Sequence, residues 1–367
     1  MNQGFTDYPV LMEKRLGEAL RSAPGPVLIT GHTGFKGTWL TLLLENLGIE
    51  VVGLSLPPTK DSLYSMAGRE GKITESFTNI KNIREVEKFL KTTKPSYIFH
   101  FAAQALVLES YKNPVETFET NVMGTVNVLS AAFATSSVNG VIVATTDKVY
   151  ENLENGRHFV ESDPLRGKDP YSASKVGTES VVDAWRQIAK NIGGPKIVAV
   201  RAGNVIGGGD LSNDRLLPDI VRAIRDRKQI LIRNPKSVRP WQHVLDPLRG
   251  YIMSAEKLSH SQTHSAAYNF GPSDMGITVE DVVNIYLEAW GDSSIATKIT
   301  QEIQNLEAVN LQINSKLARS ELSWAPRINS SQAVISTAEW WKRVEESSKF
   351  VPEACALDIS RFLQTVD

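Results

Sequence analysis

The sequence predicts an α/β protein with a Rossmann-type, doubly wound parallel sheet and a smaller, mixed C-terminal substrate-binding domain. Short apolar runs typical of buried strands alternate along the chain with segments typical of helices, which is the pattern of a parallel sheet. The first strand leads into the glycine-rich loop GHTGFKG at 31–37, and a later strand ends in the polar residues TTDK at 145–148. Because open α/β sheets bind ligands at the carboxyl ends of their strands, both features are expected at one edge of the sheet.

The dinucleotide-binding domain is expected over residues 25–200, with residues 244–272 returning to it. Its first strand, PVLIT at 26–30, runs into a loop whose three glycines have the order GxxGxxG. Glycine at these places permits a tight turn and lets the backbone approach a diphosphate, while the start of the next helix supplies N–H donors and a favourable dipole. The loop residues expected to bind the cofactor are Gly31, Thr33, Gly34, Phe35, Lys36 and Gly37.

The other elements of this domain follow in alternation. Further strands are expected at 51–56, 73–80, 97–101, 141–144 and 196–201. Helices are expected between them at 38–47, 83–94, 121–135 and 171–188. Ahead of the domain, residues 1–24 are expected to form a helical leader, because Val10, Leu11, Leu16 and Leu20 would form one apolar stripe on a helix.

The ends of the second, third and fourth strands offer further cofactor contacts. The second strand ends without the carboxylate that binds the ribose 2′-hydroxyl of NAD, and Ser55 stands nearby instead, which leaves NAD and NADP both open. Asn79 and Ile80 at the end of the third strand are expected beside the adenine. Small residues after the fourth strand suit a dinucleotide that passes close to the backbone. The contacts expected from there onward are Phe101, Ala102, Ala103, Gln104, Asn121 and Thr145.

A tyrosine and a lysine four residues apart follow the polar strand end. Pro170 can begin a helix, and Tyr171 and Lys175 then share one helical face. A positive charge beside a tyrosine favours the phenolate, so the pKa of Tyr171 is expected to be lowered. Such a phenolate can take a proton from a sugar hydroxyl near neutral pH. The pair alone is a common pattern, and it gains weight from Thr146, from Asp147 and from the glycine loop.

The substrate-binding domain is expected over residues 201–243 and 273–367. Arginines are frequent between 215 and 239, and those in loops or at strand ends can grip phosphates with their planar fork. For His243 the sequence leaves substrate contact and packing equally open. The substrate-binding candidates are Gln104, Asn204, Arg215, Leu216, Arg233, Arg239 and His243.

The composition argues against several kinds of partner and site. The 40 Lys and Arg residues against 41 Asp and Glu give a formal net charge of −1, which provides no general attraction to nucleic acid or to an anionic membrane. No apolar run reaches the length of a membrane span and the first residues lack the pattern of a signal peptide, so a cytoplasmic protein is expected. The single cysteine, Cys355, cannot form an internal disulfide, and the spacing of the 6 histidines predicts no metal site.

With these motifs assembled, the chain resembles the extended short-chain dehydrogenase/reductase superfamily and, more narrowly, the group of CDP-glucose 4,6-dehydratases. The stretches that support the resemblance are TGHTGFKGTWL (30–40), VETFETNVMGTVNVL (115–129), TDKVYEN (146–152), VRAGNVIGGGD (200–210) and IRNPKSVRPWQHVLDPL (232–248). The resemblance covers roughly residues 25–330. It implies a tightly bound, recycled NAD, a CDP-sugar substrate and a homodimer or a dimer of dimers.

The resemblance also implies roles for the polar residues. Tyr171 removes the proton of the sugar O4 as hydride leaves C4 for the nicotinamide, while Thr146 bonds the same oxygen and Lys175 binds the nicotinamide ribose. Asp147 matches the acid for the departing C6 hydroxyl, and hydride then returns to C6. Related dTDP-glucose dehydratases have an acidic C5 base where this chain has Lys148, as the CDP-glucose group does, so the C5 base stays open.

The expected reaction is conversion of CDP-D-glucose to CDP-4-keto-6-deoxy-D-glucose. A nucleotide-sugar 4-epimerase needs the Tyr–Lys pair but no acid at Asp147, so the TDK stretch favours a dehydratase, of CDP-glucose or of another nucleotide sugar. A dinucleotide-sensing protein without catalysis is a third alternative. The intact Thr146, Tyr171 and Lys175 argue against it.

Overall fold

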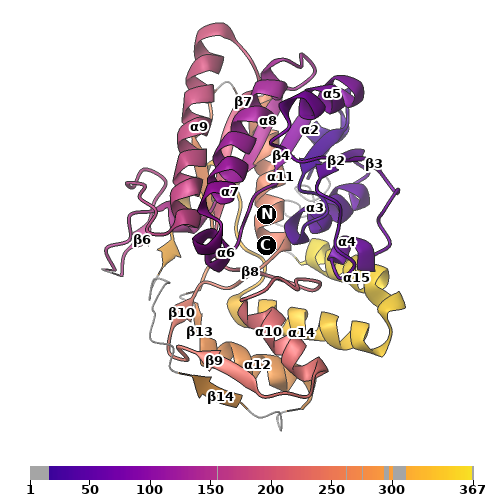
Figure 1. The fold of residues 1–367 in the computed structure, drawn as a ribbon, viewed down its shortest axis with the longest axis vertical. Helices are drawn as coiled ribbons and strands as arrows, with labels where there is room; N and C mark the ends of the chain where they lie inside the picture. Colours follow the sequence, from indigo (N-terminus) through magenta and orange to yellow (C-terminus); the bar gives the residue numbers. More distant parts are fainter. Residues whose placement is uncertain are drawn as a thin grey trace, which may run out of the picture.

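A seven-stranded parallel sheet forms the centre of the structure, which confirms the predicted fold class (Figure 1). Its order is β12-β7-β5-β4-β1-β2-β3, and each neighbouring pair runs in parallel. The strands are β1 (Val27–Thr30), β2 (Val51–Ser55), β3 (Thr74–Phe77), β4 (Tyr97–His100), β5 (Gly140–Ala144), β7 (Lys196–Ala202) and β12 (Ala267–Phe270). Because the strand order reverses between β1 and β4, a ligand crevice is expected at their carboxyl ends.

The computed structural model describes residues 16–154, 156–261, 263–274, 276–292, 297–300 and 311–365. Val10 and Leu11 of the expected N-terminal leader lie outside these residues. The described end of the leader contains the short helix α2 (Glu18–Arg21). Leu16 and Leu20 are buried there and pack into the core of the main domain.

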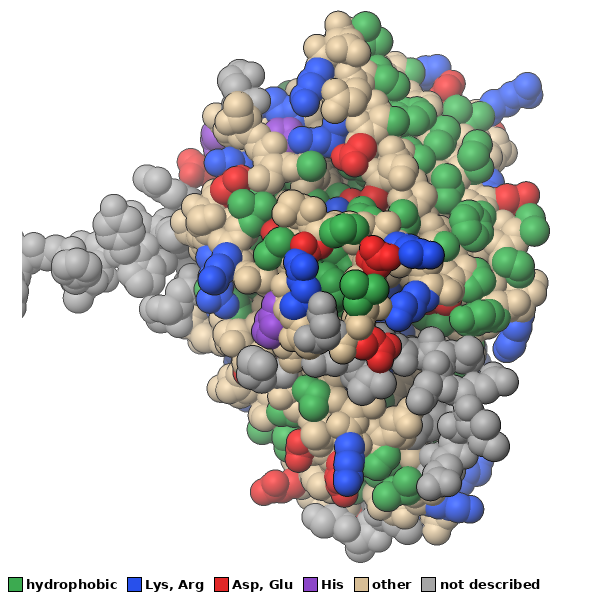
Figure 2. Space-filling view, turned by 90° about the vertical axis from the view of Figure 1, so that its left-hand side faces the viewer, with side chains coloured by type: hydrophobic (Ala, Val, Ile, Leu, Met, Phe, Trp, Pro, Cys, Tyr) green, Lys and Arg blue, Asp and Glu red, His purple; other side chains and the backbone are tan. Residues whose placement is uncertain are grey.

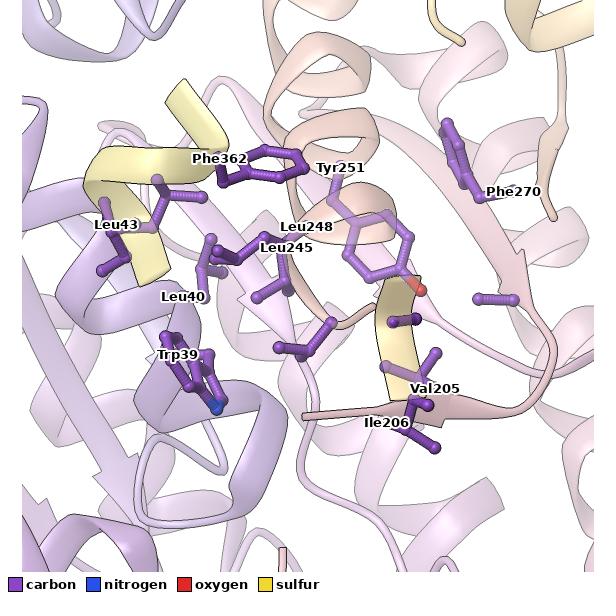
Figure 3. Packing of buried hydrophobic residues seen from close by; sticks show 14 of the residues in the cluster. Trp39, Leu40, Leu43, Val205, Ile206, Leu245, Leu248, Tyr251, Phe270 and Phe362 are labelled. Atoms are coloured by element: carbon purple, nitrogen blue, oxygen red, sulfur yellow. The ribbon is translucent and has the colours of Figure 1, made fainter. Parts of the chain in front are cut away.

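Helices cover both faces of the sheet. One face is covered by α3 (Phe35–Asn46) and α11 (Leu245–His260), and the other by α5 (Ile83–Thr93), α8 (Gly124–Phe133) and α9 (Pro170–Ile192). Successive side chains of a strand point to opposite faces. Val27 and Ile29 therefore join the cluster of α3 and α11, whereas Leu28 joins the cluster on the other face. Figure 3 shows the first cluster, with Leu40 of α3 near Leu245 and Leu248 of α11.

The segments between and after these strands form the remaining elements. Those before β7 are α4 (Leu63–Met66), α6 (Val107–Lys112), α7 (Pro114–Phe118), the π-helix η1 (Glu119–Met123), the 3-10 helix η2 (Asp147–Val149) and β6 (His158–Phe159). Those after β7 are β8 (Val205–Ile206), α10 (Leu216–Arg225), β9 (Ile230–Arg233), β10 (Val238–Arg239), β11 (Gln242–His243), β13 (Ile277–Thr278), α12 (Val279–Trp290), β14 (Thr297–Thr300), β15 (Gln312–Ile313), α13 (Lys316–Leu322), α14 (Ser330–Glu346), the 3-10 helix η3 (Ser348–Phe350) and α15 (Val351–Gln364).

The chain leaves the sheet after β7 and returns to it with α11 and β12. The short strands form pairs outside the sheet, β8 with β11, β9 with β14, β10 with β13 and β6 with β15. In the lower part of Figure 1, α10, α12 and α14 lie near the pairs β9–β14 and β10–β13. Helix α15 packs back against α3.

Four predicted boundaries are wrong. Helix α9, expected to end at residue 188, continues to Ile192. Helix α3 begins at Phe35 rather than at residue 38, because Gly34 already has the extended conformation of a helix N-cap. The third strand is β3, Thr74–Phe77, rather than 73–80. The helix expected at 121–135 instead begins at Pro114 as α7, passes through one π-helical turn and ends at Phe133. Such π-turns add a residue to a helix and occur often at functional sites.

Candidate active site

The glycine loop brings the ends of β1 and β4 together. Gly31 has φ 76°, and a Cβ on it would lie 2.7 Å from the backbone nitrogen of Ala102. A Cβ on Gly37 would lie 2.1 Å from the carbonyl oxygen of Gly31, so no larger residue fits without moving the backbone. Because α3 starts at Phe35, residues 35–37 form its first turn, whose N–H groups have no carbonyl partners inside the helix. The structure thus presents an anion-binding helix end at the predicted crevice.

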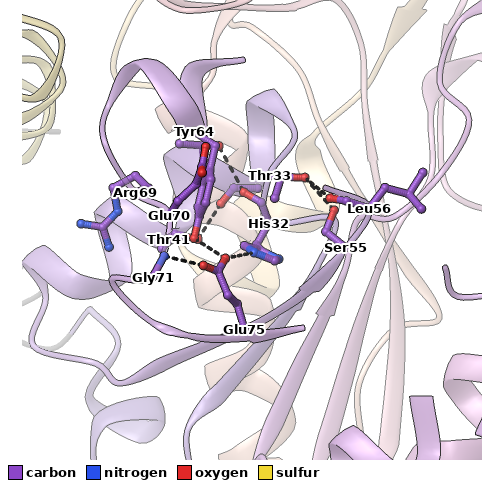
Figure 4. Close-up of polar contacts among 12 residues, drawn as sticks. His32, Thr33, Thr41, Ser55, Leu56, Tyr64, Arg69, Glu70, Gly71 and Glu75 are labelled. Carbon is purple, nitrogen blue, oxygen red and sulfur yellow. Dashed lines mark hydrogen bonds and ion pairs between the residues drawn. The ribbon is translucent and has the colours of Figure 1, made fainter. Parts of the chain in front are cut away.

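The end of β2 is fixed by hydroxyl groups in place of a carboxylate. Thr33 Oγ1 lies 2.7 Å from Ser55 Oγ and donates to the carbonyl of Leu56 at 3.0 Å, as Figure 4 shows. Both hydroxyls therefore take part in tying the first loop to the second strand. After the neighbouring strand β3, the side-chain amide oxygen of Asn79 accepts the N–H of Lys81 at 2.9 Å.

A buried histidine extends this region. The His32 ring lies against β2 where Gly53 has no side chain, and a Cβ on Gly53 would meet the ring at 2.5 Å. Its Nε2 lies 2.9 Å from Glu75 Oε2, which also accepts the hydroxyl of Tyr64 at 2.7 Å (Figure 4). Burial lowers the pKa of His32, although Glu75 opposes the shift. Glu75 of β3 thus holds the ring of His32 in place.

The residues after β5 form a compact polar turn. Thr146 caps the 3-10 helix η2, where its hydroxyl accepts the N–H of Lys148 at 3.3 Å and donates to Asp147 Oδ1 at 3.1 Å. Asp147 is buried, and burial raises the pKa of its carboxyl, with Lys148, Thr146, Lys36 and Arg239 opposing that shift. A buried carboxyl with a raised pKa keeps its proton to higher pH, as a general acid must.

Helix α9 delivers the predicted tyrosine and lysine to this turn. It begins at Pro170 because Asp169 and Ser172 form a capping box, with Ser172 N–H donating to Asp169 Oδ1 at 2.9 Å and Asp169 N–H donating to Ser172 Oγ at 3.0 Å. Tyr171 is buried, and Thr146 is near enough to influence the pKa of its hydroxyl. Lys175 Nζ donates to the carbonyl of Ala144 at 3.0 Å.

The expectation of a lowered tyrosine pKa is wrong for the protein by itself. Burial raises the pKa of Tyr171 to about 12, and the nearby Thr146 hydroxyl and the charge of Arg215 only partly oppose it. Lys175 is buried too, which lowers its pKa to about 8, with Glu179 opposing the shift. Removal of both groups from water has a larger effect on their pKa values than any neighbouring charge.

Basic side chains from several elements surround Asp147. Burial, together with the charges of Arg215 and Lys175, lowers the pKa of Lys36 to about 8, with Asp147 and Asp210 opposing the shift. Arg215 precedes α10, where its Nη1 lies 3.3 Å from Asp210 Oδ2. Arg239 on β10 is a further positive charge that opposes the raised pKa of Asp147. An anionic ligand such as a nucleotide diphosphate would satisfy this concentration of positive charge.

Two predicted site residues, Gln104 and Asn121, make contacts within the chain. The amide of Gln104 donates to the Leu106 carbonyl at 3.1 Å and to Thr117 Oγ1 at 2.9 Å. Asn121, in the π-turn η1, bridges the Gln104 carbonyl at 2.9 Å and Ser174 Oγ at 2.8 Å, so it ties the β4 loop to α9.

His243 and Ile80 lie in the core. The His243 ring is buried, with the ring of Trp39 at 6.3 Å and a carboxylate oxygen of Asp358 at 3.8 Å. Burial lowers its pKa to about 4, and the predicted substrate contact is therefore corrected to packing. Ile80 is buried against Gly124, so its side chain packs in the core rather than lining an adenine pocket.

The remaining candidates lie in the loops around the basic cluster. Asn204 follows β7, and its carbonyl accepts the N–H of Gln242 at 3.0 Å. Leu216 opens α10 directly after Arg215. The backbone of Arg233 ends β9, and its side chain lies outside the described part of the structure.

One residue of this region gave no signal in the sequence. Tyr251 of α11 is completely buried, and its hydroxyl has no hydrogen-bond partner among the described residues. Its ring centroid lies 5.7 Å from that of Phe101 and 5.9 Å from Lys36 Nζ. Burial and the charges of Tyr171 and Asp147 raise the pKa of its hydroxyl. Within an apolar helix a tyrosine is indistinguishable from core, so only the fold brings it to the site.

The described residues contain neither a membrane-spanning helix nor a cluster of metal ligands. None of their helices is long and apolar enough to cross a membrane. They also include no group of three or more His, Cys, Asp and Glu side chains placed to hold a metal ion.

Sequence comparison gives relatives along most of the chain. The profile of the NAD dependent epimerase/dehydratase family matches residues 27–271. The chain is 40% identical over 324 residues to CDP-glucose 4,6-dehydratase of Salmonella typhimurium, which covers 86% of this chain and 90% of the relative. It is 27% identical over 352 residues to UDP-glucose 4-epimerase 3 of Oryza sativa subsp. japonica, covering 89% of this chain and 92% of that relative.

Solved structures share the architecture. The dTDP-glucose 4,6-dehydratase DesIV from Streptomyces venezuelae, with NAD and TYD bound, matches with a TM-score of 0.76 at 21% identity, covering 90% of this chain and 99% of that one. UDP-glucose 4-epimerase of Thermus thermophilus, in complex with NAD, matches with a TM-score of 0.74 at 22% identity, covering 86% and 99%. At these identities the matches concern the fold.

Proposed function

Because this chain belongs to the NAD dependent epimerase/dehydratase family, we propose that it is a nucleotide-sugar 4,6-dehydratase that converts CDP-D-glucose to CDP-4-keto-6-deoxy-D-glucose. The relative at 40% identity supports this choice of substrate. The observation that favours a dehydratase over an epimerase is Asp147, a buried acid with a raised pKa beside Thr146. Elimination of water requires an acid at the departing hydroxyl, whereas inversion at C4 does not.

The crevice between β1 and β4 fits a dinucleotide. The protein backbone at Gly31 and Gly37 is packed so closely that a Cβ on Gly37 would collide with the Gly31 carbonyl. The first turn of α3 offers free N–H groups to phosphate. The cofactor is proposed to be NAD, which the family description names. When bound, it would accept hydride from C4 and return it to C6. The residues proposed to hold it are Gly31, Thr33, Gly34, Phe35, Lys36, Gly37, Ser55, Asn79, Phe101, Ala102, Ala103, Thr145, Tyr171 and Lys175.

Tyr171 is proposed to take the proton of the sugar O4. The nearby Thr146 hydroxyl and the charge of Arg215 favour the phenolate against the cost of burial. Lys175 is held at the end of β5 by the Ala144 carbonyl, so its ammonium group stays on the tyrosine side of the crevice. Oxidation at C4 then makes the neighbouring C5 hydrogen acidic.

Asp147 and Lys148 are proposed to share the elimination. Asp147 gives its proton to the C6 hydroxyl, which leaves as water, and Lys148, in its deprotonated amine form, takes the proton from C5. Hydride then returns to C6 and a proton to C5, so the net change is loss of one water. Arg215 and Arg239, with Asn204 and Leu216 nearby, are proposed to hold the substrate diphosphate, because their positive charges gather at this side of the crevice.

The proposal is tested by incubating the purified protein with CDP-glucose and no added cofactor, followed by mass spectrometry and NMR of the sugar nucleotide. A 4-keto-6-deoxy product, lighter by one water, supports both the dehydratase and a retained, recycled NAD. CDP-galactose as the only product would instead favour a 4-epimerase. Parallel reactions with UDP-, dTDP- and GDP-glucose test the choice of nucleotide.

A homodimer is proposed from an exposed apolar face. Figure 2 views the side of the molecule on which α9 lies in Figure 1, and hydrophobic side chains gather over part of it. Exposed apolar residues on α6, α7, η1 and α9 include Tyr111, Val115, Phe118, Met123, Ile188 and Ile192. Light scattering of a Val115→Asp variant is expected to give a monomer. Leu231→Asp, a matched change on exposed β9, should leave the dimer intact.

A further inference from the structure

We infer that the buried ion pair between Glu179 and Arg201 is a positioning device that holds both ends of the catalytic segment 145–150 against α9 and β7. This inference rests on the proposed function for its kinetic consequences and on geometry alone for its structural ones. Neither residue belongs to the predicted cofactor or substrate contacts. Both are almost completely buried, with side chains 5% exposed.

Glu179 holds the first end of the segment. It lies one helical turn after Lys175 on α9, and its Oε1 accepts the hydroxyl of Thr145 at 2.5 Å. The same carboxylate takes two hydrogen bonds from Arg201, at 2.8 Å from Nε and 2.9 Å from Nη2. Such a two-bond arrangement fixes the orientation of both groups. Thr145 is therefore held in place by the helix that also presents Tyr171 and Lys175.

Arg201 holds the other end. Its Nη1 donates to the hydroxyl of Tyr150 at 2.8 Å and to the carbonyl of Glu161 at 3.1 Å. The Tyr150 hydroxyl donates in turn to Asn269 Oδ1 on β12 at 2.7 Å. Its ring stacks on Phe159 with 5.0 Å between centroids. The two partners of one ion pair thus fix residues 145 and 150.

Three of the five proposed catalytic residues lie between these two fixed points. Thr146, Asp147 and Lys148 belong to a turn of only six residues, so a shift of either end would move all three relative to Tyr171. Misplacement of catalytic groups by about 1 Å can cost roughly 100-fold in rate. The ion pair is therefore expected to influence turnover far more than its distance from the sugar would suggest.

The charge of Glu179 has a second effect. Glu179, on the same helix as Lys175, raises the pKa of that lysine. The charge of Lys175 in turn lowers the pKa of Lys36 on α3 and of His100 on β4. Glu179 is the acidic group among these, and it favours the protonated lysine. Loss of the Glu179 carboxylate should therefore favour the neutral form of Lys175.

Stability must be separated from positioning, because loss of one partner leaves a buried charge and can unfold the protein. Replacing both partners of a buried ion pair with apolar residues of similar size is often neutral for stability. The decisive variant is therefore the double change Glu179→Met and Arg201→Met, which removes the bonds to Thr145 and Tyr150. The matched control is Arg186→Met, on the same helix, whose guanidinium donates only to structural partners such as the Ile197 carbonyl at 2.6 Å.

The first experiment is hydrogen–deuterium exchange of the intact protein without substrate. Exchange of the amides of residues 145–150 is expected to rise at least tenfold in the double variant and to stay at the wild-type level in Arg186→Met. Unchanged exchange in the double variant, or an equal rise in the control, would overturn the proposed device. Because no substrate is used, this result is independent of the proposed function.

The second experiment measures turnover of CDP-glucose by the same proteins and by Tyr150→Phe. The double variant is expected to lose about 100-fold in kcat with KM within threefold of wild type, while Arg186→Met keeps kcat. Tyr150→Phe, which loosens only the far end, should lose less. An unchanged kcat in the double variant overturns the inference. If the wild-type protein makes no product although exchange responds as expected, the proposed substrate is wrong and the positioning device stands.

Discussion

Replacement of Asp147 by asparagine tests the proposed chemistry at its most specific residue. An asparagine oxygen can still accept the hydroxyl of Thr146, which lies 3.1 Å from Asp147 Oδ1, so the turn after β5 should keep its shape. The amide cannot donate a proton to a departing hydroxyl. Oxidation at C4, which depends on Tyr171, Thr146 and Lys175, should proceed, whereas elimination should nearly stop.

The expected fall in kcat follows from the role of Asp147 as a general acid. A positioned general acid contributes about 100- to 10,000-fold to a rate, so kcat of Asp147→Asn should fall by that factor while substrate binding changes little. Burial raises the pKa of Asp147 in the wild-type protein, which keeps the acid protonated at higher pH than an exposed aspartate. The wild-type rate of elimination should therefore fall only as pH rises through this raised pKa, and the asparagine variant should lack that limb.

The assay is rapid mixing of enzyme with CDP-glucose while the absorbance of reduced nicotinamide is followed. In Asp147→Asn this signal should rise once and persist, because hydride is removed from C4 and cannot return to C6. Asp246→Asn is the control, since Asp246 is also completely buried and its pKa is also raised, to about 7, away from the site. Turnover by Asp147→Asn within threefold of wild type would refute the assignment of the acid.

Three further predictions concern the cofactor, the core and pH. Gly37→Ala should abolish retention of NAD through purification, because its Cβ would lie 2.1 Å from the Gly31 carbonyl oxygen, and absorbance of the denatured supernatant measures this. His243→Gln should lower the free energy of unfolding by about 1–3 kcal/mol in urea titrations and leave KM for CDP-glucose unchanged, because the ring is buried against Trp39. Burial raises the pKa of Asp358 from 3.8 to about 7, so its folded form binds the proton more tightly and stability should fall as pH rises between these values. Asp358→Asn should flatten that part of the dependence.

The fold was accessible from the sequence because its signals are local. Most strands of the sheet are short apolar runs, with β3 (TESF) as an exception. The loop at Gly31 and the capping pattern at Asp169 mark where helices begin. Pattern reading also brought together Thr146, Asp147 and Tyr171, because parallel strands deliver their ends to one edge of the sheet. Exact boundaries were less accessible, since the π-turn at 119–123 follows from packing rather than from sequence.

The rest of the site depends on contacts between distant parts of the chain. Glu179 and Arg201 are 22 residues apart and Tyr251 lies in an apolar helix, so no local pattern marks them. The same limit explains the tyrosine, because the burial that raises the pKa of Tyr171 is a property of the assembled fold. His243 belongs to a motif-like stretch, yet its side chain faces α3 and α15.

The most direct test of the proposed reaction follows one hydrogen atom. CDP-glucose deuterated at C4 is incubated with the protein without added cofactor, and the product is analysed by NMR and mass spectrometry. The account predicts a 4-keto-6-deoxy product with deuterium at C6, transferred within one active site. Deuterium that remains at C4 of an inverted sugar, or a 4-keto-6-deoxy product without deuterium at C6, would contradict it.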